Sequence, residues 1–224
     1  MAFQPFNDPA AIAGYAEVTP RKVPGYADLH RMTMLLLAED APAAAEILVV
    51  GAGGGLELKA FAEAHPEWRF AGVDPSAPML ALADRVLGPL KPRVAFHHGF
   101  VDTAPPGPFD GATCLLTLHF LARDERLHTL REMHRRMKRG ARLVVAHHSA
   151  PAGADARHWL TRSAAFAAVP DSDPAHVSIS AAAMVERLPL LTPAEDEALL
   201  REAGFFDVAL FYAAFSFRGW VATA

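Results

Sequence analysis

The sequence predicts an α/β protein in which a mostly parallel sheet lies between two layers of helices. Strand-like and helix-like runs alternate between residues 45 and 149, which is typical of βαβ units. Several strand-like runs are apolar throughout, as expected for strands that are buried on both faces. Residues 205–224 then read as two strands joined by a very short turn, and such a pair must be antiparallel.

The expected elements follow one another in a regular order. Strands are expected at 45–50, 68–74, 93–99, 109–120 and 141–149, with helices at 56–65, 77–87 and 124–139. The last of these helices begins with acids and ends with bases before Gly140, a pattern that suits the helix dipole and a left-handed cap. With the terminal strand pair, the sequence predicts a Rossmann-like three-layer sandwich around a seven-stranded sheet.

Two segments fall outside this alternation, although we expect a single domain over residues 1–224. We interpret residues 1–41 as a helical lid and 42–150 as the ligand-binding core. Residues 151–191 are rich in Ala, Pro and Asp, and because a structureless connection of that length is unusual we expect a helical cap insertion there. The terminal helix and strand pair occupy 192–224.

Composition restricts the classes of partner. No apolar run is long enough to span a membrane, and the first residues lack the features of a secretory signal, so we expect a cytoplasmic protein without a membrane partner. The net charge of −4 disfavours a nucleic acid partner. The basic cluster at residues 131–139 nevertheless leaves such a partner open. The expected partner is a small-molecule substrate, and a homodimer is left open. Cys114 lies in an apolar run and is expected to be a buried structural thiol.

A glycine-rich turn and a later acid suggest a ligand site. Gly51, Gly53 and Gly55 stand where the first strand meets the first helix, and Asp74 ends the second strand. Glycine allows positive φ and close approach of a ligand, and an acid at this position commonly binds ribose hydroxyls. Tight packing of the turn and helix capping by the acid are the alternatives. Together the two features favour a nucleoside ligand.

The glycine spacing narrows the choice of nucleoside. A dinucleotide site needs a third small residue where this chain has Leu56, and a phosphate-binding loop needs a lysine, which does not follow Gly55. Both NAD and ATP are therefore disfavoured, and an NAD-linked oxidoreductase is only a distant alternative.

At this point the sequence resembles the class I S-adenosylmethionine-dependent methyltransferases. The runs "ILVVGAGGG", "FAGVDPSAPML", "FDGATCLLTLHFL" and "MKRGARLVVA" look like their motifs, and "RKVPGY" with "LLTLHFL" looks closest to the carboxy-S-adenosylmethionine synthases and their methyltransferase relatives. The resemblance implies S-adenosyl-L-methionine as cofactor and an unidentified, small-molecule methyl acceptor. The cofactor-binding residues it implies are Tyr26, Gly51, Ala52, Gly53, Gly55, Asp74, Pro75, Met79, Phe100, Val101 and Leu115.

The chain departs from these families at three places. Val49 stands where an acid commonly helps to hold the cofactor ammonium, so we expect backbone or water to replace it. Phe100 stands where an acid is common beside adenine, and Asp102 is expected to substitute for it. The stretch 178–184 lacks the arginine expected of a carboxy-cofactor synthase, which favours ordinary methyl transfer.

His119 is the candidate general base, because it follows the fourth strand at the mouth of the expected crevice and histidine titrates near neutral pH. A structural histidine is the alternative, and His147 and His148 come next. Adjacent strand residues point to opposite faces, so neither His97 with His98 nor His147 with His148 should chelate one metal ion. No metal site is predicted. Further lid and cap candidates are Tyr15, Arg21, His158, Trp159 and Phe166.

The cofactor carries the chemistry of methyl transfer, so an obligatory base is not required. Two other functions therefore remain open: a carboxy-S-adenosylmethionine synthase-like enzyme, and a non-catalytic module that only binds S-adenosylmethionine.

Overall fold

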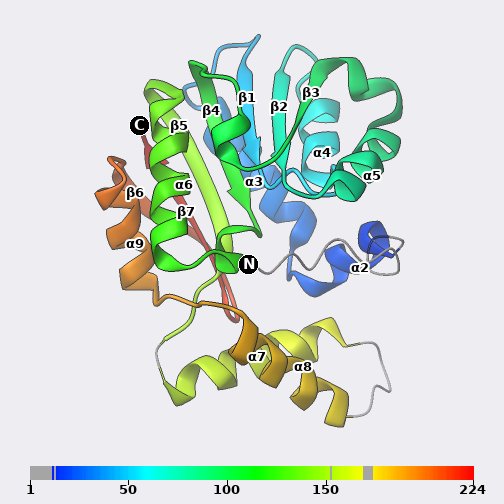
Figure 1. Ribbon diagram of the computed structural model, residues 1–224, viewed down its shortest axis with the longest axis vertical. Helices are drawn as coiled ribbons and strands as arrows, with labels where there is room; N and C mark the ends of the chain where they lie inside the picture. The colour runs from blue at the N-terminus through cyan, green and yellow to red at the C-terminus, as the bar shows by residue number, and fades with distance from the viewer. Residues whose placement is uncertain (1–11, 13, 152, 169–173) are drawn as a thin grey trace.

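The computed structural model describes residues 12, 14–151, 153–168 and 174–224, and they form the predicted α/β fold (Figure 1). One seven-stranded sheet has the order β3-β2-β1-β4-β5-β7-β6. Strands β1 to β5 run parallel to one another, and β7 is antiparallel to both β5 and β6. The strands are β1 (Glu46–Val50), β2 (Arg69–Asp74), β3 (Val94–His98), β4 (Phe109–Leu115), β5 (Met137–His148), β6 (Phe206–Ala214) and β7 (Phe217–Thr223).

Helices cover both faces of the sheet, as the apolar strands predict. The helices that pack on one face are α3 (Tyr26–Ala38), α4 (Leu56–Ala64) and α5 (Ala77–Leu87), and those on the other are α6 (Arg123–Arg135) and α9 (Pro193–Glu202). Alternate residues of β1 belong to the two cores, Val49 to the first and Leu48 to the second. The predicted three layers are therefore confirmed.

Helix α2 of the lid and the described helices of the cap lie beyond the carboxyl ends of the parallel strands (Figure 1), whereas α3 of the lid packs on one face of the sheet. The described part of the lid includes α2 (Tyr15–Lys22), which contacts α7 (Ala154–Ala167) of the cap, and α7 packs on α8 (Pro174–Arg187). Residues 1–11 and 13 of the predicted lid, and 152 and 169–173 of the predicted cap, lie outside the described residues. The edge where lid and cap meet the sheet also holds the reversal of strand order between β1 and β4, which is where open α/β sheets bind ligands.

The helix expected to stop at Gly140 ends earlier, so this prediction was wrong. Helix α6 ends at Arg135, and the next strand, β5, begins at Met137. Gly140 has a φ of +84° inside that strand, where the register with β4 shifts. Its N–H donates to the Ala224 carbonyl, with N···O 2.7 Å. Pairing with the last strand therefore outweighs the local charge pattern that favoured a longer helix.

In the described ranges, no helix combines the length and the apolar character that crossing a membrane requires.

Candidate functional site

A cavity opens at the carboxyl ends of β1, β2 and β4, and we call it the glycine-edge cavity. Residues of the lid helices α2 and α3, of the turn after β1 and of the loops after β2, β3 and β4 line it. Its lining comprises Tyr15, Tyr26, His30, Val50, Gly51, Ala52, Gly53, Leu56, Glu57, Val73, Asp74, Pro75, Met79, Gly99, Phe100, Val101, Leu115, Leu116, Thr117, Phe120, Leu121 and Thr129.

The glycine turn forms one edge of this cavity and depends on the absence of side chains. Gly51 has a φ of +78°, and a Cβ there would lie 2.0 Å from Thr117 Oγ1. The turn's N–H groups are already used within the protein: those of Gly51 and Ala52 donate to the Val73 carbonyl, with N···O 2.8 and 3.0 Å. Packing of Thr117 against the turn thus requires glycine at position 51, and the N–H donors of Gly51 and Ala52 are not free.

Asp74 joins the turn to the end of β2. Its Oδ2 accepts a hydrogen bond from the Gly53 N–H, with N···O 2.9 Å, and its Oδ1 accepts one from the Ser76 N–H, with N···O 2.8 Å. Burial raises the pKa of this carboxyl, and these two donors partly offset the effect. Each carboxylate oxygen has further acceptor capacity, so Asp74 can still bind hydroxyl groups in the cavity.

The structure brings nearly all of the predicted cofactor residues to this one cavity. Those that line it are Tyr26, Gly51, Ala52, Gly53, Asp74, Pro75, Met79, Phe100, Val101 and Leu115. Gly55 does not line it, because the helix packs there instead: a Cβ on Gly55 would lie 2.8 Å from Ala83 Cα of α5. Close packing of the first helix therefore depends on this glycine, one residue earlier than in a dinucleotide-binding turn.

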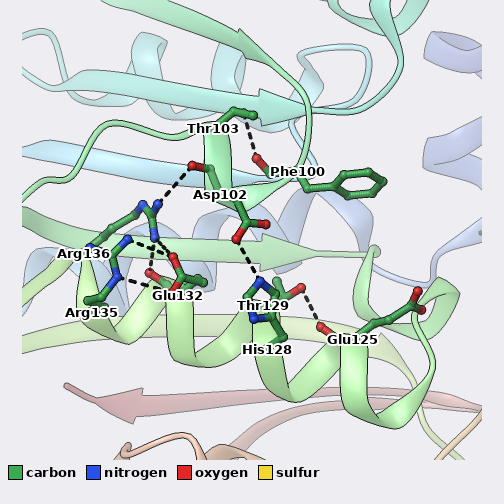
Figure 2. A network of polar contacts seen from close by, with 9 residues as sticks. All are labelled: Phe100, Asp102, Thr103, Glu125, His128, Thr129, Glu132, Arg135 and Arg136. Carbon is green, nitrogen blue, oxygen red and sulfur yellow. Dashed lines mark hydrogen bonds and ion pairs between the residues drawn. The ribbon is translucent and has the colours of Figure 1, made fainter.

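The loop after β3 places two neighbouring side chains in different environments (Figure 2). Phe100 lines the cavity and is 50% exposed. The Asp102 side chain instead lies 2.9 Å from His128 Nε2 on α6, and its carbonyl accepts from Arg136. The prediction that Asp102 takes the place of an acid beside adenine is therefore wrong, because its carboxylate faces α6.

The basic cluster after His128 is largely paired. Glu132 accepts hydrogen bonds from both Arg135 and Arg136 (Figure 2). These contacts lower the pKa of Glu132 to about 2, the Arg135 hydrogen bond contributing most. Arg136 is buried, so this face of α6 does not present a free basic patch.

His119 lies behind the cavity wall. It is buried in the turn after β4 and is absent from the cavity lining. The His148 N–H lies 3.4 Å from its Nδ1, and burial keeps the pKa of His119 well below its usual value, so the ring is neutral. Its predicted role as a general base stays a prediction.

A second cavity lies under the cap, and we call it the cap cavity. It opens between α2, α7, α8 and the ends of β5 and β7, and its lining comprises Lys22, His148, Ser163, Ala164, Ala167, Ala168, His176, Val177, Ser180, Ala183, Met184 and Phe217. His148 Nδ1 lies 2.7 Å from Ser216 Oγ, which lies 2.6 Å from Ser163 Oγ. Burial lowers the pKa of His148 to about 3. The cap cavity is thus mostly apolar, with a few hydroxyl and imidazole groups and one lysine.

His147 points to the opposite face from His148, as adjacent strand residues should. Its Nε2 lies 3.2 Å from Asp196 on α9, whereas His148 stacks on Phe217. Over the residues that the structure describes, no group of three or more His, Cys, Asp or Glu could hold a metal ion.

Of the five further lid and cap candidates, Tyr15 alone lines one of these two cavities. Tyr15 lies against the glycine turn, 2.7 Å from the position of a Cβ on Gly54. Trp159 packs against the guanidinium groups of Arg162 and Arg218, at 4.5 and 5.7 Å from its ring centroid. Neither Trp159 nor the predicted Arg21, His158 and Phe166 belongs to the lining of either cavity.

The sequence reasoning missed Glu57. An acid in the first turn of a helix is ordinarily a solvated charge that complements the dipole, so its position gave no signal. In the structure Glu57 is only 7% exposed, lines the glycine-edge cavity and accepts a hydrogen bond from Thr113 Oγ1. Burial raises the pKa of its carboxyl to about 8.

Comparisons with known proteins concern the sequence and fold around this cavity. Residues 47–140 match a family model described as a methyltransferase domain. This stretch contains most of β1, all of β2 to β4, the glycine turn and Asp74. A search of curated proteins returned no significant match.

Solved structures of S-adenosylmethionine-dependent methyltransferases share the fold. A putative O-methyltransferase from Nostoc punctiforme is 20% identical over 97% of this chain and 61% of its own, with a TM-score of 0.69. Human N-acetylserotonin methyltransferase, solved with S-adenosylmethionine, is 14% identical over 98% of this chain and 60% of its own, with a TM-score of 0.62. The chain thus spans about three fifths of the length of each.

The same fold is found in a protein named for another reaction. The [4+2]-cyclase SpnF is 23% identical over 81% of this chain and 59% of its own, with a TM-score of 0.57. Fold likeness at this level does not specify a reaction.

Proposed function

We propose that this chain binds S-adenosylmethionine in the glycine-edge cavity and transfers its methyl group to a small-molecule acceptor held under the cap. The observation that carries the proposal is the hydrogen bond from the Gly53 N–H to Asp74 Oδ2. It joins the bare turn and the acid into one continuous edge of one cavity, although the two features were inferred separately from the sequence.

The residues of the cavity fit such a nucleoside. Asp74 has acceptor capacity for two ribose hydroxyls. Phe100 presents a half-exposed ring on which a base can stack, and Val101 and Leu115 supply apolar walls.

The bound cofactor supplies a methyl group that is already a reactive electrophile. This chain's own task is therefore to align an acceptor and to exclude water. Tyr15 and Tyr26 of the lid close the cavity beside the glycine turn. Burial raises the pKa of Tyr15 to about 12, so it stays neutral and acts as cover.

The cap cavity supports a small acceptor with both apolar and polar groups. Val177, Met184 and Phe217 contribute apolar surface, while Lys22 and His176 can bind a carboxylate or a phenolic oxygen. Since Glu132 already pairs Arg135 and Arg136, a nucleic acid acceptor is disfavoured.

Ordinary methyl transfer is favoured over synthesis of a carboxylated cofactor. A transferred carboxylate would need a cationic clamp beside the sulfonium, and arginine is well suited to that task. Within the described ranges, neither cavity has an arginine in its lining. Mass spectrometry of any ligand that copurifies with the protein tests this choice, since a carboxylated sulfonium would contradict it.

Isothermal titration calorimetry with S-adenosylmethionine and S-adenosylhomocysteine tests the proposal. We expect saturable binding of one equivalent of either, and absence of binding at millimolar ligand would refute the proposal. Incubation with phenols, amines and carboxylic acids should then release S-adenosylhomocysteine with at least one class. Binding without turnover across that panel would instead support the non-catalytic module.

A further inference from the structure

Glu57 is a buried acid without a cation. In the described part of the chain, Thr113 is its hydrogen-bond donor, and no Lys, Arg or His nitrogen lies within ion-pair distance of it. A buried carboxylate that lacks a cation is costly. Because Glu57 also lines the glycine-edge cavity, a cationic ligand could relieve that cost.

The position of Glu57 matches the gap noted at Val49. In the sheet register Val49 of β1 pairs with Thr113 of β4, so the two side chains point to the same face. Glu57 of α4 bonds Thr113 on that face. Its carboxyl group therefore lies beside the strand position where related proteins commonly carry an acid, although it comes from the next helix.

The distance across the sheet also fits. Asp74 ends β2, and Glu57 bonds β4, with β1 between them. Neighbouring strands lie about 4.8 Å apart, so β2, which carries Asp74, and β4, which carries the partner of Glu57, are about 10 Å apart. A nucleoside whose sugar lies at Asp74 and whose amino-acid chain crosses β1 brings its nitrogen to Glu57.

We propose that Glu57 binds the α-ammonium group of the cofactor's amino-acid portion, in place of the acid missing at position 49. This inference rests on the proposed function. It assigns to the residue a binding role, and no part in the methyl-transfer step.

The other titratable groups around Glu57 leave it as the anion available to that ammonium. Tyr15 of α2 and Tyr26 of α3 have raised pKa values, caused chiefly by burial, so both stay neutral. Burial raises the pKa of Cys114 on β4 and lowers that of His30 on α3 to about 4, so these are neutral as well. The remaining acid of the cavity, Asp74, already accepts two backbone N–H groups.

The test compares two ligands that differ in one group: S-adenosylhomocysteine and its desamino analogue, which lacks only the amino group. For Glu57→Gln we expect the affinity for S-adenosylhomocysteine to fall about 10- to 100-fold, the range for a lost charged hydrogen bond. Affinity for the desamino analogue should change less than about threefold. Glutamine keeps the size of the side chain and an acceptor for Thr113.

The matched control is Glu63→Gln on the same helix. Glu63 is exposed and lies 3.9 Å from Lys59, so this variant should bind both ligands as the wild type does. Equal loss of both ligands in Glu57→Gln would show a general packing defect and overturn the proposal, as would unchanged affinity for both. Failure of the wild type to bind either ligand would instead refute the proposed function itself.

A second measurement needs no variant. Since the pKa of Glu57 is about 8 in the free protein, pairing with an ammonium at pH 7 must release a proton from its carboxyl. Calorimetry in two buffers of different ionisation enthalpy should detect that proton with S-adenosylhomocysteine and not with the desamino analogue. Equal proton release with both ligands would contradict the proposal.

Discussion

Two buried acids, one on each face of the sheet, lie in contrasting surroundings. Glu57 and Asp196 each stand in the first turn of a helix and are 7% and 2% exposed. Asp196 accepts a hydrogen bond from Arg126 and lies 3.2 Å from His147. Burial raises its pKa, but these neighbours together bring it below the usual value. Burial without a cation raises the pKa of Glu57. The paired acid thus stabilises the framework, whereas the unpaired one is the acid that we propose binds a ligand.

The largest change in stability is expected when the ion pair between Arg126 and Asp196 is broken. Arg126 is 1% exposed, so Arg126→Met removes a buried guanidinium, leaves Asp196 with His147 as its remaining ion-pair neighbour and should lower the free energy of unfolding by about 3–5 kcal/mol. Urea denaturation measures the loss. The double variant Arg126→Met/Asp196→Leu should recover most of it, because no charge then remains unpaired. A loss below about 1 kcal/mol in the single variant would mean that the pair is not structural.

A smaller change in the free energy of unfolding, of opposite sign, is expected when Glu57 is substituted in the ligand-free protein. Its pKa is about 8 in the folded state against 4.5 for the free side chain, so between these values the folded state binds more protons at Glu57, and the contribution of this residue to stability should fall as pH rises. Glu57→Gln removes this dependence and should raise the free energy of unfolding at pH 8 by about 1–3 kcal/mol. Urea denaturation at pH 5 and pH 8 provides the measurement.

Asp196 supplies the internal contrast for that experiment. Because its folded-state pKa lies below the usual 3.8, the stability it contributes is present above that pH and is lost only as pH falls further. Buried His30, His119 and His148 have lowered pKa values and so also change the stability between pH 5 and about pH 6.5. The difference between the profiles of the wild type and Glu57→Gln should therefore report Glu57. A profile that Glu57→Gln leaves unchanged would argue against an unpaired acid at this position.

The smallest change in the free energy of unfolding is expected for a substitution of Phe100, at the end of the glycine-edge cavity where we place the base. The same substitution should clearly weaken ligand binding. Phe100→Ala removes a half-exposed ring, so stability should change by less than about 0.5 kcal/mol. Loss of base stacking should weaken S-adenosylhomocysteine and its desamino analogue alike, by about 1–3 kcal/mol. Asp102→Ala is the control in the same loop, since that side chain faces His128. If Phe100→Ala discriminated between the ligands, the assignment of the two ends would be reversed.

The hydrophobic pattern and the glycine spacing of the sequence predicted the sheet. They also predicted the edge of the glycine-edge cavity that the carboxyl ends of the strands form. The glycine turn and Asp74 are adjacent in the fold because parallel strands finish at one edge, so their meeting could be inferred from the sequence. The burial of Glu57 could not, because it depends on how deeply α4 settles against Thr113 of β4. The contact of Asp102 with His128 likewise joins segments whose relative placement no periodicity encodes.

The end of helix α6 was misjudged for a related reason. The charges of residues 124–139 suit a helix, but β5 already begins at Met137, and Gly140 pairs with Ala224. A strand partner more than eighty residues away in the chain thus decides the boundary.

Helix α2 borders both cavities. Tyr15 at its first residue lines the glycine-edge cavity, and Lys22 at its last residue lines the cap cavity. A tilt of this short rod that widens one chamber is transmitted to the other. We therefore expect the affinities of the two ligands to be reciprocally coupled.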